Sequence, residues 1–389
     1  MTEEQEPFLN AIYQDPDQHE PLQIYSDWLA ERGDSRGEFI QLQLQLEQTG
    51  LPSDQRKELV SRESSLLKQN KEQWLKELAP ELTENWAPSG QHFDSTDLYK
   101  FTFEKGFLSK LRIEFLFPDF ASKLAQSSQA RMLKELVLLD IPGGEELTES
   151  FEVFQNESWG YEDSPSLDAL ATGEFPNLRR LEIHSESHLE SSLELLKMLA
   201  SSTRLEDLDL SIRGISMGKL FQTNMPSLKS LTVYHQSDYP IEQLAANSSL
   251  TQLEKIDFFP HAVEPGDEAY LNIDSIRQIC QSQHLKNLRH LRLESSNFGN
   301  DGIEEMIQSG LLARLESLQI PHGSVTDTGA QLLADANLEN LKRLDLTGNY
   351  LTDAGTHLLV EKEVSLQSGE QRNMASFVHE EQLYIGDWE

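Results

Sequence analysis

The chain has 389 residues, of which 66 are acidic and 32 are basic, so its formal net charge at pH 7 is −34. A surface this acidic repels phosphate backbones and anionic lipids, which argues against nucleic acid and membranes as partners. The single cysteine, Cys280, excludes an internal disulfide framework, and no apolar run reaches the ~18 residues of a membrane-spanning helix. The acidic N-terminus lacks the basic and apolar regions of a secretory signal, so we predict a cytoplasmic protein.

Residues 1–80 carry helical patterns and no repeat. Apolar residues at helical spacing predict amphipathic helices near residues 4–14 and 22–33. The segment EFIQLQLQLEQ, which starts at Glu38, alternates like a strand, but its Gln and Glu content and its helical neighbours favour a helix. Ser53 can cap a fourth helix that runs to about Leu78. We therefore predict a small all-α domain over residues 1–80 and a polar junction with an N-terminal cap over residues 81–107.

The centre of this region reads SDWLAERGDSRGEFIQLQLQLE and starts at Ser26. It resembles the short companion domain found ahead of repeat arrays in many bacterial proteins of unknown function, and the resemblance implies no activity. Gly33 and Gly37 would bracket a tight turn between helices, where polar side chains satisfy backbone groups. The alternative interpretation is a second docking site, made of Asp27, Asp34, Arg36 and Glu38.

A repeated unit occupies most of the remaining chain. In the stretch from Leu285 to Leu359, an L-x-x-L-x-[LI] run leads three times into a polar turn and then into a glycine-containing segment with helical spacing. The last copy fits L-x-x-L-x-L-x-x-N-x-L at every defined position, so the chain resembles the leucine-rich-repeat family. Faint copies begin at Leu108 and Leu133, and seven clearer ones, 23 to 35 residues apart, begin at Leu178, Leu205, Leu228, Leu253, Leu288, Leu315 and Leu341.

Each L-x-x-L-x-L run predicts one strand of a parallel sheet, with its leucines pointing into the core and a helix outside. The predicted fold class is therefore α/β: a leucine-rich-repeat solenoid over residues 108–359, with a curved parallel sheet inside and helices outside, preceded by the all-α domain. Repeats of about 26 residues with helices resemble the ribonuclease-inhibitor-like subclass. The family's turn asparagine occurs only as Asn349, while residues such as Gln236 replace it elsewhere, which predicts irregular turns. Residues 360–389 should cap the last repeat.

An acidic insertion at about residues 140–176 interrupts the array. It contains the aromatic residues Phe151, Phe154, Trp159 and Tyr161 among many carboxylates. A loop of this length inside a compact array is often functional. The alternative is a solvated excursion with a locally packed aromatic cluster.

The sequence contains no phosphate loop, dinucleotide fingerprint, nucleophile elbow or paired-cysteine metal motif. Asp207 and Asp209 share one side of a strand, and with Asp257 they could bind a hard cation, although exposed strand positions explain them better. Cys280 has apolar neighbours and no basic activator, which favours a small core residue. We predict no catalytic residue, no metal site and no cofactor.

The strand residues between the leucines should face the concave side of the solenoid. In the middle of the array they include aromatic or acidic side chains, namely His184, Asp209, Tyr234, Asp257 and Phe259. Aromatic side chains bury much area at little entropic cost, and carboxylates steer a basic partner. We therefore predict a non-catalytic protein–protein interaction module that binds a basic partner protein here. Three alternatives stay open: scattered exposed residues, an adaptor whose N-terminal domain recruits a second protein, and a metal-assisted enzyme.

Overall fold

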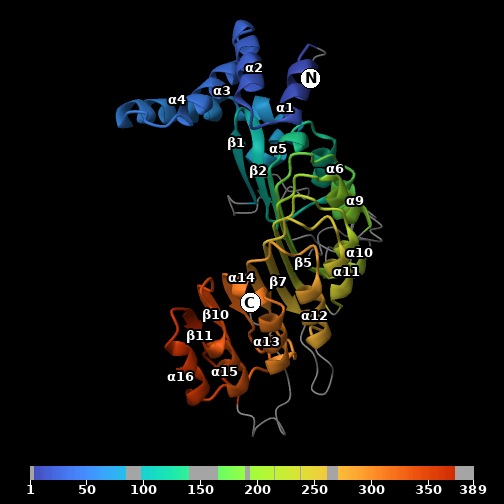
Figure 1. Cartoon of the computed structure of the whole chain (residues 1–389). Helices are drawn as coiled ribbons and strands as arrows, with labels where there is room; N and C mark the ends of the chain where they lie inside the picture. The colour runs from blue at the N-terminus through green and yellow to red at the C-terminus, as the bar shows by residue number, and fades with distance from the viewer. Residues whose placement is uncertain are drawn as a thin grey trace. The chain divides into compact units, whose positions relative to one another are not determined.

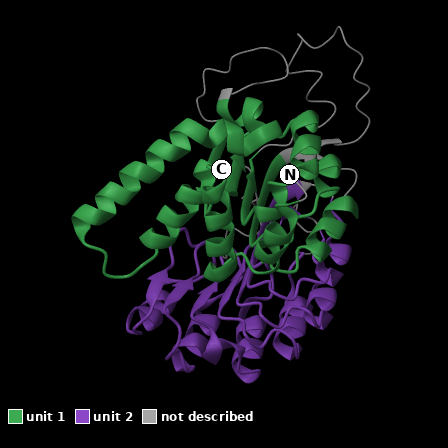
Figure 2. Ribbon diagram, turned by 90° about the horizontal axis from the view of Figure 1, so that it is seen from above, with its two compact units in different colours: residues 1–205 green, residues 206–389 purple. Residues whose placement is uncertain are grey.

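The computed structural model describes residues 4–84, 98–139, 165–188, 193–213, 215–236, 238–260 and 270–372. The chain divides into two compact units, residues 1–205 and 206–389 (Figure 2). Strands follow one another in chain order, with β1 to β4 in the first unit and β5 to β11 in the second (Figure 1). None of the described helices combines the length and the apolar character needed to cross a bilayer.

The first unit begins with an all-α region, as predicted. It contains α1 (Glu6–Gln14), α2 (His19–Glu31), α3 (Ser35–Leu46), α4 (Ser53–Leu75), the 3-10 turn η1 (Lys76–Leu78) and α5 (Ala79–Glu84). The segment with strand-like alternation is helical because α3 is buried on two sides. Ile40 shares a core with α1 and α2, while the ring of Phe39 lies 4.9 Å from that of Trp74 on α4. Ser53 is the first residue of α4 rather than its cap, since Pro52 occupies the cap position.

The turn between α2 and α3 uses its glycines in two different ways. Gly33 has a φ of +71°, in the left-handed region that ends many helices, and the space around it is open. Gly37 lies inside α3, where an added Cβ would come within 2.5 Å of the Ser26 carbonyl oxygen of α2. Asp34 caps α3, because its carboxylate accepts a hydrogen bond from the Arg36 backbone N–H at 2.9 Å.

A β-hairpin follows, with its first strand in the segment predicted as a junction and its second strand at the first predicted faint repeat. Strands β1 (Tyr99–Glu104) and β2 (Phe107–Ile113) pair antiparallel. Lys105 and Gly106 join them, both with positive φ, as the twist of a two-residue hairpin requires. The unit continues with α6 (Pro118–Gln126), η2 (Ala130–Met132), β3 (Glu135–Leu138), α8 (Pro165–Ala171), β4 (Arg180–His188) and α9 (Leu193–Ser201).

Part of the predicted acidic insertion is a helix. Helix α8 falls within residues 140–176 and packs between α6 and α9, so it serves as an outer helix of the array. The other part of that prediction, which includes the aromatic residues Phe151, Phe154, Trp159 and Tyr161, lies outside the described residues.

The helical region and the first strands share one core. Ile40 of α3, Phe107 of β2 and Met132 of η2 are buried in a single cluster. The Gln43 amide donates to the Phe103 carbonyl oxygen at 3.1 Å and accepts from the Gly106 N–H at 3.2 Å, which ties α3 to the hairpin. The helices of the first unit are therefore fixed to the start of the array.

The second unit repeats a strand, a turn and an outer segment. Strands β5 to β11 are parallel, and the inward apolar side chains of β5 to β10 are almost fully buried. The strands are β5 (Asp207–Arg213), β6 (Ser230–Gln236), β7 (Lys255–Pro260), β8 (His290–Leu293), β9 (Ser317–Gln319), β10 (Arg343–Asp345) and β11 (Ser365–Gln367). The helices are α10 (Met217–Gln222), α11 (Ile241–Ala246), α12 (Ile273–Gln281), α13 (Gly299–Gln308), α14 (Leu311–Arg314), α15 (Asp327–Asp335) and α16 (Asp353–Val360).

Amide side chains hold the turns of this unit. The buried Asn349 donates to the Ile320 carbonyl oxygen at 2.7 Å and accepts from the Val325 N–H at 2.8 Å, both in the preceding repeat. Gln371 bonds the Leu346 carbonyl oxygen and the Leu351 N–H in the same way, at 2.7 and 2.9 Å. Gln236 likewise donates to the Ile212 carbonyl oxygen. Glutamine thus bonds a backbone carbonyl of the preceding repeat as Asn349 does, and these three turns are more regular than the sequence indicated.

The predicted fold class is confirmed. The chain is an α/β protein with a parallel repeat sheet, outer helices and an all-α region at its N-terminal end.

Candidate functional site

We call the side of β5 to β9 that carries the residues between the buried leucines the open face, because the helices of the second unit lie on the other side of these strands (Figure 1). The register aligns two rows of side chains across it. One row contains Asp209, Thr232, Asp257, Arg292 and Gln319, and the other contains Ser211, Tyr234 and Phe259. Parallel strands are about 4.8 Å apart, so neighbours within a row touch.

An aromatic stack is the main feature of the open face. The rings of Tyr234 and Phe259 are 4.3 Å apart and 12° from parallel, and both side chains are half-buried. The guanidinium carbon of Arg292 lies 4.6 Å from the centre of the Phe259 ring, within the range of a cation–π contact. Arg292 also donates to Glu294 at 3.2 Å and to Gln319 at 3.1 Å. The stack is therefore held rigidly and offers a flat aromatic surface.

The carboxylates of the open face are partly neutralised. Asp257 accepts from the Lys255 ammonium at 2.8 Å, and its side chain is only 13% exposed. Asp209 lies two strands away, with Thr232 between them in the register. Among the described residues no group of three or more His, Cys, Asp or Glu side chains could hold a metal ion, so Asp207, Asp209 and Asp257 do not form a cation site there.

The structure brings together four of the five predicted binding residues. Asp209, Tyr234, Asp257 and Phe259 lie on neighbouring strands of the second unit. His184 lies on β4 of the first unit, where its Nε2 is 3.5 Å from a Glu182 carboxylate oxygen. The prediction left out Arg292, although an arginine one strand beyond Asp257 at the same register position was visible in the sequence.

Three residues of the predicted second docking site bond to groups outside it, and Asp34 bonds to Arg36 within it. Asp27 accepts from Gln41 at 2.9 Å, and Glu38 accepts two hydrogen bonds from Arg62, at 2.6 and 2.8 Å. Asp34 caps α3, and Arg36 is 8% exposed and points inward. Only Asp27 and Glu38 therefore offer polar groups to a partner on the surface of the α2–α3 pair.

Cys280 is half-buried on α12, and this burial raises the pKa of its thiol. A raised thiol pKa leaves little thiolate at neutral pH, so the residue lacks the property of a reactive cysteine. Its position agrees with the prediction of a packing residue.

Comparisons with known proteins give only distant similarities. No protein family matches the chain, and no curated protein does. A structure from Bacteroides fragilis is 20% identical, with 66% of this chain and 71% of that chain covered and a TM-score of 0.47. An internalin from Listeria monocytogenes is 17% identical, with 65% and 70% covered and a TM-score of 0.39, and the yeast Rad7–Elc1 complex is 16% identical, with 94% and 98% covered and a TM-score of 0.32. Similarity at this level carries no information on ligand or activity.

Proposed function

We propose that the protein is a non-catalytic interaction module that binds a basic partner protein on the open face of the second unit. The observation that carries the proposal is the stack of Tyr234, Phe259 and Arg292. Stacked aromatic side chains and arginine are the residue types that dominate binding energy at protein interfaces.

The physical case rests on rigidity. Two rings that already pack against each other lose little rotamer freedom on binding, so most of the area they bury stabilises the complex. The faces of the rings can also receive a cationic side chain of the partner. Binding there needs no rearrangement of β6 or β7, since the stack is formed in the unbound chain.

The positive charge proposed for the partner follows from the net charge of the whole chain more than from single carboxylates on the open face. A net charge of −34 accelerates the approach of a basic protein and slows that of an acidic one. Asp257 contributes less than expected because Lys255 lies against it. The proposal therefore assigns affinity to the aromatic stack and association rate to the overall charge.

Affinity capture from the native cell, followed by surface plasmon resonance with the purified partner, tests the proposal. The double variant Tyr234→Ala and Phe259→Ala should weaken binding about 30-fold, which corresponds to a hot-spot loss of about 2 kcal/mol. Tyr270→Ala, which removes a half-buried tyrosine elsewhere in the second unit, should leave affinity unchanged. Higher salt should reduce the association rate and leave the dissociation rate nearly constant. Full affinity in the double variant, or association that salt accelerates, would contradict the proposal.

His184→Ala, measured in the same assay, tests the predicted contribution of His184 to binding. The adaptor alternative stays a prediction, and its test must avoid deletion of residues 1–80. Such a deletion would expose the core around Ile40 and Phe107 and unfold the first strands. Asp27→Ala with Glu38→Ala leaves that core intact, and it should abolish recruitment of a second protein if the adaptor function exists.

A further inference from the structure

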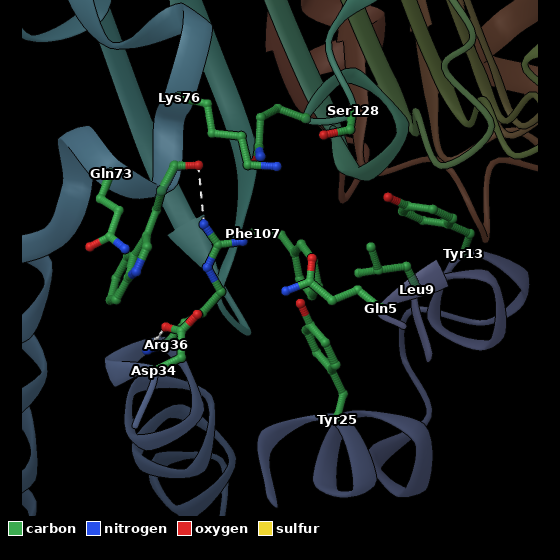
Figure 3. A pocket seen from close by; sticks show the side chains of 12 residues that line it. Gln5, Leu9, Tyr13, Tyr25, Asp34, Arg36, Gln73, Lys76, Phe107 and Ser128 are labelled. Atoms are coloured by element: carbon green, nitrogen blue, oxygen red, sulfur yellow. Dashed lines mark hydrogen bonds between the residues drawn. The ribbon is translucent and has the colours of Figure 1, made fainter. Parts of the chain in front are cut away.

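The first unit contains a cavity of about 110 Å³ at the place where its helices meet the first strands (Figure 3). Its lining comes from α1, α2, the start of α3, the end of α4, the start of β2 and the loop before η2. Pockets for drug-sized molecules measure about 300–1,000 Å³, whereas one water molecule takes about 30 Å³. The cavity therefore suits a small ligand of a few heavy atoms.

Two cationic side chains line this cavity. Arg36 is 8% exposed, and one of its terminal nitrogens donates to the Trp74 carbonyl oxygen at 3.1 Å. A guanidinium has five N–H donors, so this bond leaves most of them available. Lys76 approaches from the end of α4, and Figure 3 shows its ammonium and the Arg36 guanidinium extending toward the same space.

Within the described part of the chain neither cation forms an ion pair with a carboxylate, although the charge of Asp34 acts on Arg36 and that of Glu77 acts on Lys76. Asp34, the one acidic side chain in the lining, uses its carboxylate to cap α3. Arg36 is the buried member of the two, whereas Lys76 is exposed. A buried cation without a paired anion is costly, and it is unusual in a chain that carries a net charge of −34. The balance of charge in the cavity therefore favours an anionic ligand.

The tyrosines of the cavity add neutral donors. Burial raises the pKa of Tyr25 to about 12, so its hydroxyl keeps its proton at neutral pH. The pKa of Lys76 is lowered, first by partial burial and then by the nearby charge of Arg36, which is the response of an ammonium in a positive field. An anion placed between the Lys76 ammonium and the Arg36 guanidinium would raise the pKa of Lys76 again.

The backbone conformation of Lys76 is a second, independent observation that supports a ligand site at this cavity. Its φ of +55° and ψ of −121° lie in a region that side-chain-bearing residues rarely adopt and that glycine adopts easily. Strained backbone of this kind tends to occur at ligand sites, where the surrounding structure holds it. Here it delivers a lysine to the cavity at the point where α4 ends.

We propose that this cavity binds a phosphate group, with Arg36 and Lys76 as its charged ligands and the Tyr25 hydroxyl as a neutral donor. The three groups come from three helices and approach the space from different sides (Figure 3), which suits the tetrahedral oxygens of phosphate better than the two coplanar oxygens of a carboxylate. Arginine binds phosphate through two parallel hydrogen bonds, and lysine adds a point charge. This site is separate from the proposed open-face interface and does not depend on it.

Isothermal titration calorimetry of the full chain with inorganic phosphate, against sodium chloride of equal ionic strength, tests the proposal. Lys76→Gln should weaken phosphate binding about tenfold or more, and Tyr25→Phe, which keeps the ring, about threefold to tenfold. Lys68→Gln is the matched control, because it makes the same charge change at an exposed position of α4 outside the cavity, and it should bind within about twofold of the wild type. Arg36 is left unchanged, since the loss of this buried side chain could unfold the helices.

Further titrations separate the possible outcomes. Acetate should bind much more weakly than phosphate, and equal binding would overturn the assignment of a phosphate group. Saturable binding of phosphoserine that is tighter than that of inorganic phosphate would support the site and identify a phosphomonoester as its source, whereas the reverse order would identify the free ion. Absence of saturable phosphate binding, or an equal loss in Lys76→Gln and Lys68→Gln, would refute the proposal.

Discussion

The turn at Asn349 allows a quantitative test of how the repeats are held together. Asn349→Ala removes the hydrogen-bond partners of the Ile320 carbonyl oxygen and the Val325 N–H. Asn349 is 0% exposed, so both groups lose a partner inside the protein. Each buried backbone group left without a partner costs about 1–3 kcal/mol, so we expect a loss of about 2–5 kcal/mol in the free energy of unfolding.

Urea unfolding followed by circular dichroism measures this loss, and hydrogen exchange of the peptide that contains Val325 locates it. Asn340→Ala is the control, because Asn340 donates a single hydrogen bond, at 2.7 Å, from an exposed position. That substitution should cost about 1 kcal/mol or less. Asn349→Gln should cost less than Asn349→Ala, since Gln371 makes equivalent bonds in the next turn. Equal costs for Asn349→Ala and Asn340→Ala would refute the idea that the amide holds the turn.

Three further predictions concern stability. In urea unfolding, Gly37→Ala should cost about 1–3 kcal/mol, because the added Cβ meets the backbone of α2. Gly33→Ala should cost about 1 kcal/mol, because the space around Gly33 is open and only its positive φ is unfavourable. A larger cost for Gly33→Ala than for Gly37→Ala would argue against the close approach of α2 and α3. The pKa of His322 is lowered to about 4, first by burial, so as the pH falls the imidazole of the unfolded chain becomes protonated before that of the folded protein. Between about pH 7 and about pH 5 the free energy of unfolding should therefore fall by about 1 kcal/mol after allowance for solvent screening. His322→Gln should flatten this pH dependence. Phe258→Ala should lower the free energy of unfolding by about 3–5 kcal/mol, because it creates a cavity in the core. Phe259→Ala, on the opposite side of the same strand, should lower it by less than about 1.5 kcal/mol. Equal losses would show that the open face is part of the core.

The sequence predicts the repeat sheet well because its signal is periodic. Leu341, Leu344 and Leu346 each point into the core, and apolar residues recur at the same spacing in β5 to β10. The helix α3 was predicted against its own alternation, and packing on two sides explains why that alternation misleads. Strand β1 was missed because it falls in the predicted junction and lacks a leucine pattern, although Tyr99, Phe101 and Phe103 alternate as in a strand. The turn that follows it, Lys105 and Gly106, is a short local signal that could have indicated the hairpin.

The two candidate sites differ in how visible they are to sequence analysis. Tyr234 and Phe259 occupy equivalent positions of neighbouring repeats, so the period alone places them side by side. The cavity cannot be found in this way. Tyr25, Arg36 and Lys76 come from three helices, and their convergence depends on the angles at which α2, α3 and α4 pack. Arg36 was singled out in the sequence as a surface docking residue, and only its burial shows that it serves the interior.

The amide side chains at Gln236, Asn349 and Gln371 also determine where the protein can accept foreign sequence. Gln236 and Asn349 each lie eight residues after the start of their repeats, and Gln371 occupies the position after β11 that Asn349 occupies after β10. Successive repeats start 23 to 35 residues apart, so changes of length accumulate on the helical side alone. A peptide epitope grafted into the exposed loop between α15 and β10 would therefore extend outward without shifting the register of any strand. An insertion of one residue between a strand and its turn would separate the amide from the carbonyl that it bonds. The helical side of the array is thus suited to the insertion of foreign peptides, whereas the open face is suited to single substitutions that keep the length of each strand and turn.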